Sequence, residues 1–289
     1  MHRALLAAAL TLAVAAGLTG CARPNRGRDL VTAFYPLQYL GQRIGGDPAA
    51  VVNLTKPGAE PHDVELNPRQ VAQVADARLA VYLHGFQPAV DAAVEQEAAG
   101  RSFDVATAVP LLPSATESFD PHIWLDPLRF AEIGDKLGVR LGQTDPAHAA
   151  DYTARARKLH TELDALNQEY ATGLATCDRR ELVTSHAAFG YLANRYGLTQ
   201  VGITGISPEA EPSPRRLAAV AATARDTGTT TIFFETLVSP KVADTVAREI
   251  GARTAVLDPL EGLTDPSADY FTVMRANLAA LTSALGCRE

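Results

Sequence analysis

Cysteine is scarce in this chain of 289 residues, where only Cys21, Cys177 and Cys287 occur. Three cysteines exclude a four-cysteine zinc cluster and a dense disulfide scaffold. The chain also lacks the signatures G-x-S-x-G, H-E-x-x-H and G-x-G-x-x-G and a Walker A loop, which argues against the commonest hydrolase and nucleotide-binding enzymes. Its basic residues form no run and its formal charge is −7, so we expect no nucleic-acid partner.

Apolar residues are plentiful, with 47% hydrophobic and 20% charged residues, so the chain can bury real cores and is not disordered. Eight short β-rich runs alternate with helical patterns, four in each half of the sequence. Such alternation predicts an α/β fold of two similar lobes with parallel sheets and crossover helices. The predicted strands are 30–33, 51–54, 79–83, 103–106, 182–185, 200–203, 231–234 and 254–257.

One uninterrupted helical pattern runs from Pro146 to about Gly173, with apolar residues at three- and four-residue spacing. At 1.5 Å per residue this helix would be roughly 40 Å long, enough to pass along both lobes as a stiff linker. We therefore divide the chain into five parts. These are a signal peptide (1–20), a tether (21–28), an N-terminal lobe (29–144), a linking helix (145–174) and a C-terminal lobe (175–289).

The first residues are typical of a targeting segment, since a basic start is followed by an apolar stretch too short to span a bilayer comfortably. The stretch ends in Leu18-Thr19-Gly20-Cys21, which resembles the lipobox of bacterial lipoproteins. The resemblance implies that Cys21 is lipidated and anchors the mature protein to the outer face of the cytoplasmic membrane. In that oxidising compartment we predict a Cys177–Cys287 disulfide; the alternative is two buried free thiols.

Histidines follow the predicted strands. His62, His122 and His186, together with Asp258, come after the second, fourth, fifth and eighth strands. Because the carboxyl ends of parallel strands form the ligand-binding edge of a sheet, two facing lobes would bring these side chains to one cleft. Three imidazoles and a carboxylate form a plausible tetrahedral Zn²⁺ site. Position alone does not exclude His84, which also follows a strand.

Several separated segments resemble the zinc and manganese solute-binding proteins of ABC transporters, known as the cluster A-I or cluster 9 family. The resemblance runs from about Leu30 to the C-terminus and implies two α/β lobes joined by a rigid helix, with a metal between them. The segments are 57–68 around His62, 120–127 around His122, 186–198, 206–214 (Ile-Ser-Pro-Glu-Ala-Glu-Pro-Ser-Pro) and 257–260.

The family pattern places the metal ligands at His62, His122, His186 and Asp258, and not at His84. Histidine at the third ligand position accompanies zinc-type members and glutamate accompanies manganese-type members, so His186 favours Zn²⁺, although Mn²⁺ remains possible. Carboxylates are expected to orient the imidazoles. The candidates for that role are Glu60, Asp120 and Glu235.

The resemblance implies a lipid-anchored, monomeric receptor, not an enzyme, that captures Zn²⁺ outside the membrane and delivers it to an ABC permease. A manganese-binding or mixed-metal receptor is the nearest alternative. A zinc hydrolase would need an open coordination position for water, which four protein ligands do not leave. An extracellular adhesin is a third alternative, which nothing in the sequence supports beyond exposure at the cell surface.

Overall fold

Two four-stranded parallel sheets form the framework of the protein in this computed structural model, which describes residues 30–47, 49–114 and 117–288. The predicted signal peptide and tether, including Cys21, lie outside the described residues. The strand order is β2-β1-β3-β4 in the first sheet and β6-β5-β7-β8 in the second. The strands are β1 (Leu30–Thr32), β2 (Val51–Asn53), β3 (Leu79–Tyr82), β4 (Ser102–Asp104), β5 (Glu181–Thr184), β6 (Thr199–Gly202), β7 (Thr231–Phe234) and β8 (Arg253–Val256).

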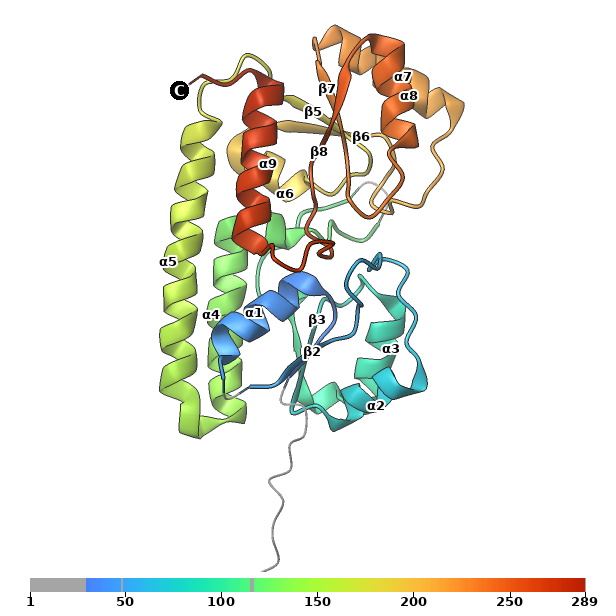
Figure 1. Cartoon of the computed structure of the whole chain (residues 1–289). Coiled ribbons are helices and arrows are strands. Elements are labelled where there is room, and N and C mark those ends of the chain that lie inside the picture. The colour runs from blue at the N-terminus through green and yellow to red at the C-terminus, as the bar shows by residue number, and fades with distance from the viewer. Residues whose placement is uncertain (1–29, 48, 115–116, 289) are drawn as a thin grey trace, which may run out of the picture.

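Helices connect the parallel strands in both lobes, as the predicted α/β fold requires, and the two lobes lie one above the other (Figure 1). All eight predicted strands are present, shifted by at most one residue at their starts. The helices are α1 (Tyr35–Gly45), α2 (Pro68–Asp76), α3 (Pro88–Glu97), α4 (Pro127–Thr144), α5 (Ala149–Gly173), α6 (Gly190–Tyr196), α7 (Pro214–Asp226), α8 (Lys241–Ile250) and α9 (Tyr270–Leu285). Short 3-10 turns occur at Ala99–Arg101, Val105–Thr107, Ile123–Leu125 and Pro146–His148.

Polar residues before proline start several of these helices. The Asn67 side chain accepts hydrogen bonds from the backbone of Arg69 and Gln70 and forms a capping box at the start of α2. The Asp126 side chain accepts hydrogen bonds from the backbone of Leu128 and Arg129 at the start of α4. The long helix begins as a 3-10 turn at Pro146–His148 and becomes α-helical at Ala149, so the Asp145-Pro146 signal marks a turn that leads into the helix.

Helix α5 runs along one side of both lobes (Figure 1) and contacts α1 and α4 of the first lobe and α9 of the second. It buries one apolar stripe, formed by Tyr152, Ala156, Leu159, Leu163, Leu166 and Tyr170. Through this stripe the larger hydrophobic core continues from the first sheet into α9 and the inner part of the second sheet. A smaller core lies between the second sheet and helices α7 and α8. The shared core ties the two lobes into one packed unit.

Cys177 and Cys287 form the predicted disulfide, which joins the segment after α5 to the end of α9. The neighbouring backbone is also paired, because the two cysteines form an isolated antiparallel β-bridge. The disulfide therefore links the end of α9 to the segment that follows α5. Among the described residues, none of the helices has both the length and the apolar character needed to cross a membrane.

Replacing both bridged cysteines, in the variant Cys177→Ala/Cys287→Ala, is expected to lower the free energy of unfolding by about 2–5 kcal/mol, because the bridge restricts the unfolded chain. Urea unfolding of the mature protein, followed by circular dichroism, measures this change. Wild-type protein unfolded in the presence of reductant should lose the same stability. Equal midpoints for oxidised wild type and the double variant would contradict the prediction.

Candidate metal centre

Loops at the carboxyl ends of strands from both sheets carry the candidate residues. His62 lies between β2 and α2, and His122 directly precedes the 3-10 turn Ile123–Leu125. His186 follows β5 by two residues, and Glu261 lies in the loop between β8 and α9. Because all strands within each sheet are parallel, these loops emerge at one edge of each sheet, where open α/β folds bind their ligands.

Four side chains converge between the lobes, and one candidate ligand atom from each lies within 4.8 Å of all the others. They are His62, His122, His186 and Glu261. Glu261 Oε1 is 3.1 Å from His62 Nε2, 2.9 Å from His122 Nε2 and 3.5 Å from His186 Nε2. The Nε2 atoms of His122 and His186 are 3.3 Å apart. Three imidazole nitrogens therefore face a single carboxylate oxygen.

The cluster is almost completely removed from solvent. The side chains of His122, His186 and Glu261 have no exposed surface, and that of His62 is 9% exposed. Glu261 Oε2 is buried without a hydrogen-bond partner. A buried carboxylate oxygen without a partner is costly, and coordination of a cation would satisfy it. Three imidazoles, which bind a metal in their neutral form, and one carboxylate are a donor set that fits Zn²⁺.

Asp258, the fourth ligand expected from the sequence, does not belong to this group. Its Oδ1 accepts a hydrogen bond from the Leu260 backbone N–H at 2.7 Å, and its Oδ2 accepts one from Thr236 Oγ1 at 3.0 Å. Glu261, three residues further along the same loop, reaches the histidines instead. The sequence offered two carboxylates in Asp258-Pro259-Leu260-Glu261 and no signal that decided between them, since the choice depends on the path of the loop.

Three further carboxylates contact the histidines at their Nδ1 atoms or at their backbone N–H groups. Asp120 Oδ1 lies 2.8 Å from His122 Nδ1 and also accepts a hydrogen bond from the His122 backbone N–H at 3.0 Å. Glu235 Oε1 lies 2.6 Å from His186 Nδ1. Glu60 Oε1 accepts a hydrogen bond from the His62 backbone N–H at 3.0 Å. The Nε2 atoms of both rings face Glu261, while each Nδ1 lies beside a carboxylate. A proton held on Nδ1 by that carboxylate would leave Nε2 free to bind a metal.

The ionisable groups of the cluster change one another's pKa values. Burial alone would lower the pKa of His186, but the carboxylates of Glu235 and Glu261 raise this pKa to about 10. Burial lowers the pKa of His62, and burial together with repulsion from Glu261 raises the pKa of Glu60 to about 8. Burial would raise the pKa of Glu261, but the imidazoles hold this pKa well below its usual range. The site thus keeps an ionised carboxylate that attracts positive charge.

The other described histidines lie apart from this group. His84 is 67% exposed, and its Nδ1 is 3.6 Å from Asp91 Oδ2. His148 Nδ1 lies 2.7 Å from Asp145 Oδ2, and His160 Nδ1 lies 2.6 Å from Asp135 Oδ2. Each of the three is at least 39% exposed in its side chain. His84 therefore occupies a strand end without reaching the metal cluster.

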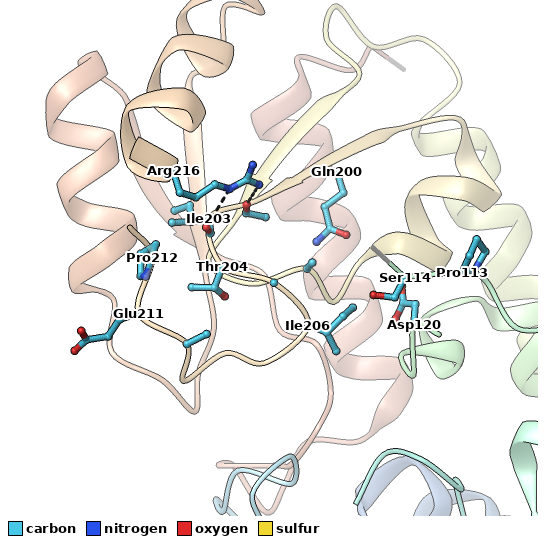
Figure 2. A pocket seen from close by; sticks show the side chains of 14 residues that line it. Pro113, Ser114, Asp120, Gln200, Ile203, Thr204, Ile206, Glu211, Pro212 and Arg216 are labelled. Atoms are coloured by element: carbon cyan, nitrogen blue, oxygen red, sulfur yellow. Dashed lines mark hydrogen bonds between the residues drawn. The ribbon is translucent and has the colours of Figure 1, made fainter. Parts of the chain in front are cut away.

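A cavity of about 510 Å³ lies beside the cluster, between the segment that carries Asp120 and the loop that follows β6 (Figure 2). Gln200, Thr204 and Arg216 line it, and the Arg216 guanidinium donates to the backbone carbonyls of Gly202 and Ile203. None of the four clustered residues lines this cavity. His62, the one partly exposed member of the cluster, lines a smaller cavity of about 200 Å³.

Comparison with known proteins agrees with this geometry. The zinc-binding protein AdcA of Streptococcus pyogenes is 33% identical over 282 residues, which cover 87% of this chain and 55% of AdcA. The chain thus spans about half the length of the AdcA proteins that it matches. The high-affinity zinc uptake system protein ZnuA of Bacillus subtilis is 34% identical, with 89% of this chain and 87% of that protein covered.

A solved structure, the Zn(II)-bound ZnuA-like domain of Streptococcus pneumoniae AdcA, superposes with a TM-score of 0.78 at 34% identity, covering 89% of this chain and 98% of that chain. The family model for the periplasmic zinc-uptake complex component A, ZnuA, matches residues 30–284. This match covers both lobes and every member of the metal cluster. The chain therefore belongs to the ZnuA family of zinc-uptake components.

Proposed function

We propose that this protein is the extracytoplasmic zinc receptor of an ABC importer. It captures Zn²⁺ between its lobes with His62, His122, His186 and Glu261 and delivers the ion to a membrane permease. The observation that carries the proposal is the convergence of three imidazole Nε2 atoms on one buried carboxylate oxygen. Membership of a family of zinc-uptake components supports the same role.

The donor set favours zinc over manganese. Imidazole nitrogen binds Zn²⁺ more strongly than Mn²⁺, which ranks lowest among the divalent first-row metals and prefers carboxylate, carbonyl and water oxygens. Three of the four proposed ligands are imidazoles. The resemblance to the family places His186 where manganese-type members carry a glutamate. We therefore assign Zn²⁺ as the cargo, with a manganese or mixed-metal receptor as the alternative.

Transport fits the site better than catalysis does. A catalytic zinc ion keeps a coordination position for water or substrate, whereas four protein ligands complete a tetrahedral shell. The four side chains of the cluster are buried or nearly so, and all four face the place where the ion would bind. The role is therefore to bind and release a metal ion rather than to activate a water molecule.

The remaining parts of the chain complete the proposal. Residues 1–20 would be removed as a signal peptide, and Cys21 would carry the lipid that holds the tether 21–28 at the outer face of the cytoplasmic membrane. The two lobes, 29–144 and 175–289, and the linking segment 145–174 would form a monomeric receptor. In this position the receptor meets both the external zinc and the permease embedded in the same membrane.

The first prediction from the proposed function concerns metal content. Mature protein purified without added metal is expected to contain about one equivalent of zinc, because four ligands form one tetrahedral site. Elemental analysis measures the zinc, and competition between Zn²⁺ and Mn²⁺ for the stripped protein measures the preference. Zinc should also raise the unfolding temperature, because an ion that binds only the folded state stabilises it. Preferential retention of Mn²⁺ would favour the manganese alternative.

The second prediction concerns the ligands themselves. His186→Ala should weaken zinc binding by more than about 100-fold, the upper end of the loss seen even for outer-shell partners of a metal. His160→Ala is the matched control, because His160 also pairs with a carboxylate but lies on the surface of α5. Competition with a chromophoric chelator gives both affinities. Equal zinc affinity in the two variants would remove His186 from the site.

The third prediction concerns the carboxylates behind the imidazoles. Asp120→Asn and Glu235→Gln should each weaken zinc binding by about 10- to 100-fold, because these carboxylates orient and polarise the rings. Asp135→Asn, which changes the surface carboxylate paired with His160, provides the control. Chelator competition again measures the affinities. If the buried and the surface substitutions had the same small effect, the carboxylates would have no role in metal binding.

A further inference from the structure

The loop that carries Glu261 has an unusual backbone. Leu260 adopts a φ of 60°, the only positive φ of a residue other than glycine among the residues that the structure describes. Leucine is disfavoured in this left-handed region, so surrounding contacts must hold it there. Its side chain is fully buried in the larger core, which fixes one side of the turn. The turn directs the next residue, Glu261, toward the three histidines.

Asp258 holds the start of this turn through all of its polar groups. Its backbone N–H donates to Asn277 Oδ1 at 2.9 Å, and its carbonyl accepts from Asn277 Nδ2 at 2.7 Å. Its carboxylate accepts from the Leu260 backbone N–H and from Thr236 Oγ1. Asn277 lies on α9 and is 2% exposed. These bonds connect the turn to α9, to the loop after β7 and to itself.

The first lobe also contacts the turn. Trp124 Nε1 donates to the carbonyl of Pro259 at 2.7 Å, and the Trp124 carbonyl accepts from Tyr270 Oη at 2.7 Å. Trp124 is 1% exposed and belongs to the 3-10 turn that begins directly after His122. The same short segment of the first lobe therefore carries the histidine ligand His122 and, through Trp124, forms a hydrogen bond to the loop that carries Glu261.

We propose that Asp258, Asn277 and Trp124 are positioning residues that fix the Glu261 carboxylate in its metal-binding place before the ion arrives. The inference rests on the proposed zinc-binding function. Glu261 then forms part of a preorganised tetrahedral set, which suits Zn²⁺ and resists the larger oxygen-rich shell that Mn²⁺ prefers. Asp258 acts through the backbone of Leu260 and does not itself coordinate the ion.

Two substitutions of Asp258 separate positioning from coordination. Asp258→Ala removes both side-chain acceptors and should weaken zinc binding by about 10-fold, a typical loss for an outer-shell partner. Asp258→Asn keeps an oxygen for the Leu260 N–H and an amide that can donate to Thr236 Oγ1, so it should recover most of the lost affinity. Zinc affinity is measured on stripped mature protein by chelator competition. If Asp258→Asn were as defective as Asp258→Ala, positioning would be refuted.

The contact from the first lobe is tested with Trp124→Phe, which keeps an aromatic ring and removes the indole N–H. We expect a loss in zinc affinity of about 10-fold and a changed d–d spectrum of the Co²⁺-substituted protein, because Glu261 is no longer held in place. Tyr170→Phe is the control, since it removes an equally buried hydrogen bond, to the Met274 carbonyl, that does not reach the loop. Thermal unfolding of the metal-free proteins checks that both variants fold.

The outcomes separate this inference from the proposed function. Wild-type protein that binds no zinc would refute both. Wild-type protein that binds one zinc, with a Trp124→Phe variant that retains both the wild-type affinity and the wild-type Co²⁺ spectrum, would refute positioning and leave the receptor function intact. A changed spectrum in Trp124→Phe, with an unchanged one in Tyr170→Phe, would support positioning, because a general loss of stability would affect both.

Discussion

The contact between one buried carboxylate and three buried imidazoles is the interaction on which the structure depends. Taking the Glu261 carboxylate out of water costs several kcal/mol unless opposite charge repays it. The three rings come from separate loops of both lobes, and they lie within 3.5 Å of one oxygen of Glu261. Small relative movements of the lobes would separate these atoms, so the rest of the molecule has to fix the position of one lobe relative to the other.

A shared hydrophobic core, an ion pair and a disulfide hold the two lobes and the linking helix together. The larger core crosses from the first sheet to α9 along α5, so neither lobe encloses its own share of this core separately. Arg195 on α6 adds a bidentate ion pair with Asp126, the capping residue of α4, with N–O distances of 2.9 and 2.7 Å. Such an Arg–carboxylate pair is directional, and it joins the second lobe to the first near the metal cluster. The disulfide fastens α9 to the end of the linking helix.

Around the cluster, acidic side chains outnumber the groups that could ionise positively. Asp120 and Glu235 lie beside the Nδ1 atoms of His122 and His186, and Glu60 accepts a hydrogen bond from the His62 backbone N–H. These carboxylates add negative charge that attracts a divalent cation, and Asp120 also accepts a hydrogen bond from the His122 ring. The large cavity beside the cluster has no imidazole in its wall, so its size does not mark the place where the metal would bind.

The sequence by itself determined the two α/β lobes, the long helix, the strand ends and the three histidines that follow them, because these features depend on local periodicity and on the direction of parallel strands. Paired thiols in an oxidising compartment also predicted the disulfide. Only the tertiary structure decided that Glu261, and not Asp258, reaches the histidines. The loop that carries Glu261 turns at Leu260 and accepts a hydrogen bond from Trp124 of the other lobe at Pro259. Trp124 and Pro259 are 135 positions apart, so no local sequence pattern records this contact.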